Sequence, residues 1–235
     1  MNTNDLEILY NKHKKDFEHA LNIYENEYSH ADLIEFIKNG SIAEKQAAVL
    51  KLDFINSQSD ADLLMDNLTG CDGKIREAVS FRLPEFAAKN PKLFIKYWQI
   101  FLEAVIDING NICRNTINAL KYIKNYSEFT QKFCKELLIR TYTLATKAKD
   151  FDIQDGKYKI NKEIFKLYWY LETIYEFAET FDYKELSSLL LQTKGVTDYT
   201  IREKTAKILS KFDDNQFESI RRNLKNDENY YVRRF

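Results

Sequence analysis

Apolar residues along this chain recur at steps of three and four, a spacing that places them on one face of an α-helix. The clearest example is Asp72–Ala88, where Ile75, Val79, Leu83 and Phe86 share one face behind an Asp-Gly start. The same period returns in most of the chain, between short Gly, Asn or Pro interruptions. The pattern predicts an all-α protein.

Looser copies of this helix recur along the sequence. Aligned on Ile75, they begin at positions 44, 75, 112, 164, 201 and 232, with spacings of 31, 37, 52, 37 and 31 residues. Repeats built from two helices have periods in this range, and each repeat needs its neighbours to close a core. We therefore expect an α-α superhelix of about five to six helical hairpins, forming a single domain over residues 1–235. The aligned helices are called the inner helices below.

Three segments depart from this repeat. Residues 1–29 predict an N-terminal capping helix, residues 150–161 predict an insertion loop, and residues 226–235 contain only the start of an inner helix at Val232-Arg233. The last segment predicts a truncated or degenerate final repeat, because a solenoid needs a capped end. The capping helix is amphipathic, and its apolar residues at helical spacing are Leu6, Leu9, Tyr10, Phe17, Ala20, Leu21 and Tyr24.

Local signals set several helix ends. Ser41 is a suitable N-cap for a helix running to Ile55. Pro91 suits the first position of a helix over Lys92–Asp107. That segment is apolar nearly all round, so we expect one continuous helix buried between neighbours, with Trp98 inside it.

The run of Asp, then Ile-Arg three residues later, then Leu seven residues after the Arg, seen from Asp72 to Leu83 and again from Asp198 to Leu209, resembles the HEAT-repeat signature. The resemblance covers most of residues 30–235 and implies an armadillo-like α-solenoid. It also implies a scaffold that binds a protein or peptide along the inner helices. A bacterial branch of HEAT-like DNA glycosylases for alkylated bases is similar in size, which leaves nucleic-acid binding or base excision as the alternative.

Arginines follow the first apolar position of three inner helices, as Arg76, Arg202 and Arg233. They could form a ladder of phosphate-binding cations. The resemblance favours a structural role, in which each pairs with an Asp or a carbonyl of an adjacent repeat, and Asp72 and Asp198 lie close in sequence.

A run of aromatic residues in one inner helix is the best candidate for a recognition surface. Tyr168 falls in the core register, which leaves Trp169 or Tyr170 nearer an open groove. The alternative is that both sides of this helix pack on neighbours. Aromatics with a polar tip are favoured at interfaces, and basic side chains of inner helices would suit nucleic acid. The candidate binding residues are Phe165, Trp169, Tyr170, Glu172, Arg114, Lys121 and Lys207.

Composition narrows the function further. Charged residues make up 30% of the chain with a net charge of -1, so bulk charge gives no nucleic-acid signal, although a local basic face remains possible. Cys71, Cys113 and Cys134 are far apart, as is usual in a reducing compartment, and no apolar run approaches the ~20 residues of a membrane helix. The motifs of phosphate loops, nucleophile elbows and zinc sites are missing from the sequence. We expect a cytoplasmic, non-catalytic protein without cofactor or metal.

Overall fold

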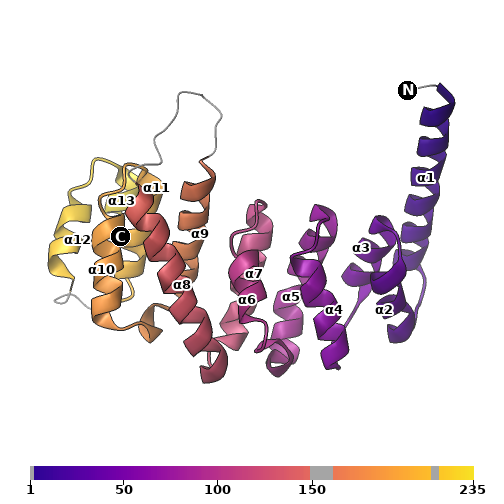
Figure 1. Ribbon diagram of the computed structural model, residues 1–235, viewed down its shortest axis with the longest axis horizontal. Coiled ribbons are helices and arrows are strands. Elements are labelled where there is room, and N and C mark those ends of the chain that lie inside the picture. The colour runs from indigo at the N-terminus through magenta and orange to yellow at the C-terminus, as the bar shows by residue number, and fades with distance from the viewer. Residues whose placement is uncertain (1–2, 149–160, 213–216) are drawn as a thin grey trace. The chain divides into compact units, whose positions relative to one another are not determined.

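The computed structural model describes residues 3–148, 161–212 and 217–235, and all its regular elements are helical (Figure 1). The prediction of an all-α protein is confirmed for these residues. The expected insertion loop at 150–161 lies outside them, apart from Asn161. The chain forms two compact units, Met1–Ile123 and Lys124–Phe235.

Unit 1 contains seven α-helices and one 3₁₀ turn among its described residues. They are α1 (Thr3–Glu25), α2 (His30–Asn39), α3 (Ile42–Lys51), α4 (Gln58–Leu68), α5 (Gly73–Lys89), η1 (Pro91–Phe94), α6 (Trp98–Ala104) and α7 (Gly110–Ile123).

Unit 2 holds the remaining helices. They are α8 (Ser127–Lys147), α9 (Lys162–Glu176), η3 (Ala178–Thr180), α10 (Tyr183–Thr193), α11 (Tyr199–Leu209), α12 (Glu218–Lys225) and α13 (Tyr230–Arg233). The short α13 lies in the segment expected to be a degenerate repeat. It packs on α11 and α12 and buries Val232.

Side-chain caps start most of the helices. Ser41 accepts a hydrogen bond from the backbone N–H of Glu44, whose carboxylate in turn accepts from the Ser41 N–H, as in a capping box. Asp72 and Asp198 accept from the first N–H groups of α5 and α11. These caps satisfy donors that have no partner within the helix, which is why the helices begin where the sequence predicts.

Two of the predicted helices are shorter in the structure than the sequence pattern predicts. The Lys92–Asp107 segment is not one helix, because the chain makes the 3₁₀ turn η1 after Pro91 and starts α6 only at Trp98. Trp98 is half-buried rather than enclosed. Helix α3 ends at Lys51 instead of Ile55, although Ile55 is still buried. Apolar side chains are therefore also buried in turns, at positions where the three- and four-residue pattern predicts helix.

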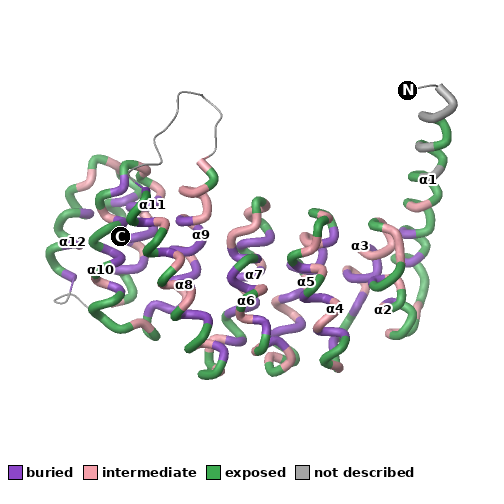
Figure 2. Tube along the Cα trace, viewed as in Figure 1, coloured by how far each residue is buried: buried purple, intermediate pink, exposed green. Residues whose placement is uncertain are grey.

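Each unit has its own core (Figure 2). In unit 1, α5 packs against α3 and α7, and in unit 2, α9 packs against α8 and α11. The apolar positions Ile75, Val79, Leu83 and Phe86 are all buried, as the opening pattern predicts. Burying large apolar side chains contributes about 1.5–3 kcal/mol each before the entropy cost.

The three arginines share one geometry. The Nη1 of each donates to the carbonyls six and five residues earlier, as Arg76 does to Gly70 (2.8 Å) and Cys71 (3.1 Å). Arg202 and Arg233 repeat this contact in their own turns. These arginines tie each inner helix to the turn before it, which confirms the structural role.

Two of these arginines also reach the next turn along the chain. Arg76 Nε donates to Asp107 Oδ2 at 2.7 Å, and Arg202 Nε donates to Asp227 Oδ2 at 2.6 Å. The nearby Asp72 and Asp198 are occupied as helix caps, so the partner is the aspartate of the following turn. In α7 the same register holds Cys113, whose thiol contacts the Asp107 carbonyl instead (3.1 Å).

The cysteines give the first test of this structure. Burial raises the pKa of Cys113 to about 12 and that of Cys134 to about 11, whereas Cys71 is exposed. Since the thiolate is the reactive form, we expect iodoacetamide at neutral pH to alkylate only Cys71 in the folded protein and all three cysteines after unfolding. Peptide mass spectrometry would check this, and native alkylation of Cys113 as fast as Cys71 would contradict it.

Candidate binding surfaces on the inner helices

The aromatic run in α9 points the opposite way from expectation. Trp169 and Tyr170 are buried, with 8% and 3% of their surface exposed, whereas Tyr168 is half-exposed. Helix α9 packs against both α8 and α11, so its buried arc includes Trp169 and Tyr170 as well as Leu171. The expectation that Trp169 or Tyr170 faces an open groove is therefore wrong. Both belong to the core of unit 2.

Glu172 and Lys207, by contrast, do come together. The Lys207 Nζ donates to Glu172 Oε1 at 2.6 Å, and Lys204 Nζ lies 2.9 Å from Oε2. Burial acts to raise the pKa of Glu172, but hydrogen bonds from Lys207 and Lys204 outweigh it and leave that pKa below its usual value. Burial likewise acts to lower the pKa of Lys204, and its bonds to Glu172 and Tyr168 leave it raised. Glu172 and Lys204 are therefore both ionised at neutral pH.

Tyrosine rings flank this cluster. Lys204 lies over the Tyr168 ring at 4.4 Å, and Lys207 and Lys211 lie over the Tyr175 ring at 4.3 and 4.5 Å. Lys204 and Lys207 of α11 thus face one carboxylate of α9. Lys211 follows the end of α11, and each of the three lysines is held on an aromatic face. The arrangement links α9 to α11 and leaves an excess of positive charge.

The Glu172 cluster predicts a pH effect on unit 2. The pKa of Glu172 is lower in the folded protein than its unfolded value of 4.5. The carboxylate therefore contributes to the stability of unit 2 above pH 4.5, and this contribution is lost as the pH falls through the folded pKa. We expect Glu172→Gln to lower the free energy of unfolding by about 2 kcal/mol at neutral pH, a loss between those typical of exposed and of fully buried ion pairs. Urea unfolding at neutral and acidic pH would measure both effects. A Glu172→Gln variant with unchanged stability at neutral pH would contradict this.

The remaining predicted site residues are dispersed. Phe165 is half-buried and makes an edge contact with Trp169, with ring centroids 6.2 Å apart. Arg114 and Lys121 are exposed on α7 in unit 1, where Lys121 Nζ donates to Asn118 Oδ1 at 3.0 Å. The structure therefore divides the seven candidates between the two units and joins only Glu172 with Lys207 by an ion pair.

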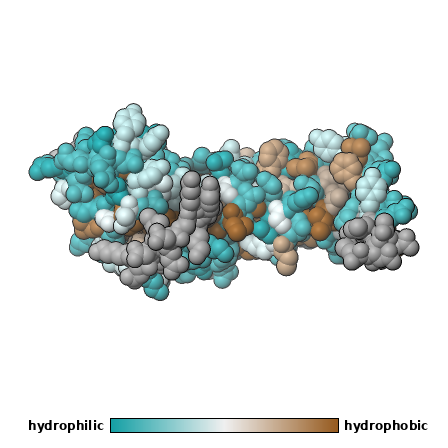
Figure 3. All heavy atoms as spheres, turned by 90° about the horizontal axis from the view of Figure 1, so that it is seen from above, coloured by the Kyte–Doolittle hydropathy of each residue, from teal (hydrophilic) through white to brown (hydrophobic). Residues whose placement is uncertain are grey.

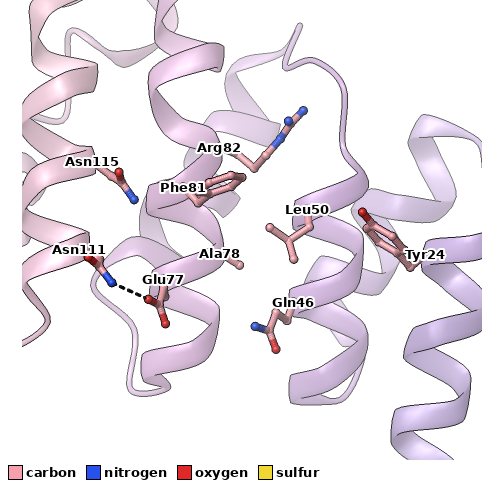
Figure 4. A pocket seen from close by; sticks show the side chains of 9 residues that line it. All are labelled: Tyr24, Gln46, Leu50, Glu77, Ala78, Phe81, Arg82, Asn111 and Asn115. Atoms are coloured by element: carbon pink, nitrogen blue, oxygen red, sulfur yellow. Dashed lines mark hydrogen bonds between the residues drawn. The ribbon is translucent and has the colours of Figure 1, made fainter.

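A groove that sequence reasoning did not single out crosses the inner helices of unit 1 (Figure 4). It has a volume of about 660 Å³ and lies between α1, α3, α5 and α7. Its walls carry amides and aromatics, and two of its rings, Phe81 and Tyr24, are 62% and 59% exposed. In Figure 3, apolar side chains also gather on the part of the surface where unit 1 lies. The lining residues are Tyr24, Gln46, Leu50, Glu77, Ala78, Phe81, Arg82, Asn111 and Asn115.

The charged groups of this groove differ in whether they already form an ion pair. Arg82 is engaged outside it, donating from Nη2 to the Leu52 carbonyl (2.7 Å) and pairing with Glu85 (2.8 Å). Glu77 accepts from the Asn111 amide at 3.3 Å, the dashed line in Figure 4, and forms no ion pair with a described residue. The groove is therefore acidic at Glu77, with amides on either side of its aromatic centre.

One sequence signal could have revealed this groove. Phe81 falls outside the core register of Ile75, Val79, Leu83 and Phe86, so a large aromatic side chain sits where the pattern predicts solvent. An aromatic residue off the core register is a candidate contact residue. The amides Asn111 and Asn115 carry no comparable signal.

Comparisons with protein-family models, with curated proteins and with solved structures found no match. Function is therefore inferred from the chain's own residues. Within the part of the chain that the structure describes, no group of three or more His, Cys, Asp or Glu is placed to hold a metal ion. No helix in the same residues combines the length and apolarity needed to cross a membrane.

Proposed function

We propose that this chain is a HEAT-like helical-repeat scaffold whose unit 1 groove binds an extended peptide segment of a partner protein. The three equivalent arginine contacts at Arg76, Arg202 and Arg233 support a repeated architecture, because each helix-turn unit satisfies its turn in the same way. The groove carries the functional part of the proposal.

The chemistry of the groove suits a peptide backbone. Gln46, Asn111 and Asn115 each offer both a donor and an acceptor, the combination needed to pair with main-chain N–H and C=O groups. Phe81 and Tyr24 supply exposed rings, and aromatic residues dominate binding energy at protein interfaces. Glu77 favours a Lys or Arg in the peptide, because its carboxylate has no cation partner among the described residues. The expected ligand combines a large apolar residue with a basic one.

Phage display of random linear peptides on the purified protein would test this. We expect selected peptides to share an apolar and a basic residue, and Phe81→Ser to weaken their binding by about 10- to 100-fold, the scale of an interface hot spot. Isothermal titration calorimetry would measure it. Tyr122→Ser is the matched control, since Tyr122 is an exposed aromatic of α7 that does not line the groove. Equal loss in both variants, or no selected peptide, would reject the proposal.

A second candidate is nucleic-acid binding by unit 2, favoured by the excess charge of Lys204 and Lys207 in α11 and of Lys211, which follows this helix. Base excision is less well supported, because Trp169 is buried and Glu172 is held by two lysines. Anisotropy of a labelled duplex and a matched single strand, at low and near-physiological salt, tests this candidate. Binding that falls steeply with salt and weakens in Lys207→Gln would support it, whereas no binding at low salt would reject it.

A further inference from the structure

The groove of unit 1 is longer across the helices than along them. Its lining residues come from α1, α3, α5 and α7, which pack side by side in that order. Packed helices lie about 8–10 Å apart, so three such spacings amount to roughly 24–30 Å. Along α5 the lining extends only from Glu77 to Arg82, a rise of about 8 Å at 1.5 Å per residue. An extended chain in this groove therefore crosses α5 and does not follow it.

Two rows of side chains with different chemistry border the groove (Figure 4). The first, here called the Glu77 row, takes one residue from each of α3, α5 and α7 and consists of Gln46, Glu77 and Asn111. The second, the Phe81 row, lies four residues further along the same helices and consists of Leu50, Phe81 and Asn115. Four residues of helix rise by about 6 Å. The carboxylate of Glu77 thus lies on one side of the groove, and the 62% exposed ring of Phe81 lies on the other.

We infer, building on the peptide binding proposed above, that the bound segment is extended and that its basic and large apolar residues are an odd number of positions apart. Successive side chains of an extended chain point to opposite sides. A chain that crosses α5 between the two rows therefore directs one side chain to the Glu77 row and the next to the Phe81 row. The residue that pairs with Glu77 and the residue that packs on Phe81 are consequently neighbours in the peptide.

Leu50 leads to the same odd spacing. Helix α3 packs beside α5, and a distance of about 8–10 Å between them corresponds to about three extended residues. A basic residue at Glu77 and an apolar residue on Leu50 are therefore three positions apart. A chain that followed α5 would instead use side chains two positions apart, because these are separated by about 6.6 Å on one side of the chain. The spacing in the peptide thus reports the direction in which it crosses the groove.

Synthetic peptides test this spacing. Each carries one Arg and one Leu in a Ser-Thr background, separated by one, two, three or four positions, and isothermal titration calorimetry measures its binding to the protein. We expect separations of one and three to bind at least ~10-fold more tightly than two and four, because an even separation turns one side chain away from its row. Equal or tighter binding at even separations overturns the inference and leaves peptide binding itself intact. Failure of every peptide to bind rejects the proposed function as well.

Moving the carboxylate to the other row gives a sharper test. Glu77→Gln combined with Asn115→Asp places the acidic group in the Phe81 row, so the basic and apolar side chains must then point to the same side. We expect this double variant to bind the peptide with a separation of two at least ~10-fold more tightly than those with one or three. Circular dichroism checks that it is helical.

Glu103→Gln is the matched control, since Glu103 is exposed on α6 and does not line the groove. This variant should keep the preference of the unaltered protein for odd separations. A double variant that also keeps the odd preference overturns the inference, because the two rows would then not lie on opposite sides of the bound chain.

Discussion

Replacing Arg202 with alanine should destabilise unit 2 by about 3–5 kcal/mol, the cost of removing one partner from a buried ion pair. The Arg202 side chain is 11% exposed and that of Asp227 is 9% exposed. The guanidinium bonds both carboxylate oxygens of Asp227 and the carbonyls of Val196 and Thr197. Its removal leaves a buried carboxylate and two carbonyls without these donors. Urea unfolding followed by circular dichroism would measure the change.

The exposed Arg114 is the control, and Arg114→Ala should change stability by less than ~0.5 kcal/mol. The pair also predicts a pH dependence. The hydrogen bond from Arg202 lowers the pKa of Asp227 below 3.8, so its contribution is present above that value and is lost as pH falls through the folded pKa. Arg202→Ala should remove most of this acid sensitivity. Equal stability of the two alanine variants would contradict the structural role of Arg202.

The sequence predicts the helices well because their signals are local. Caps such as Ser41 and Asp72 act within three residues, and the three- and four-residue period is a property of one helix. The partner of Arg76 is a different kind of problem. Asp107 lies 31 positions further along, and the sequence offers the nearer Asp72 with equal chemistry. Only the folded turns show that Asp72 is committed to capping α5.

The candidate sites were harder to predict for a related reason. An apolar period shows that a helix buries one arc, but the width of that arc depends on how many neighbours it contacts. Helix α9 contacts α8 and α11, so Trp169 and Tyr170 enter the core together while Tyr168 turns outward beside Lys204. Phe81 shows the converse, because a phenylalanine has the same hydropathy in a groove as in a core. Exposure is a property of the assembled helices and not of one residue type.

Trp169→Ala is expected to destabilise unit 2 by about 3–5 kcal/mol, because it removes a large buried side chain and leaves a cavity between packed helices. This outcome separates a core residue from a binding residue. If Trp169 were an exposed contact, the alanine variant would stay as stable as the unaltered protein and lose only partner binding. Tyr142→Ala is the control within unit 2, since Tyr142 is 40% exposed on α8, and it should cost far less.

Trp169→Phe sharpens the test. The Trp169 Nε1 is buried and has no hydrogen-bond partner among the described residues, so phenylalanine removes no hydrogen bond there. Phenylalanine also removes an unsatisfied buried donor, which costs the folded protein about 1–3 kcal/mol. This gain offsets the loss of packing that follows from the smaller ring. We therefore expect the free energy of unfolding of Trp169→Phe to lie within about 1 kcal/mol of that of the unaltered protein. The free energy of unfolding of Trp169→Ala should be well below both. Urea unfolding of both variants decides the point, because equal large losses would mean that the indole N–H is bonded in solution.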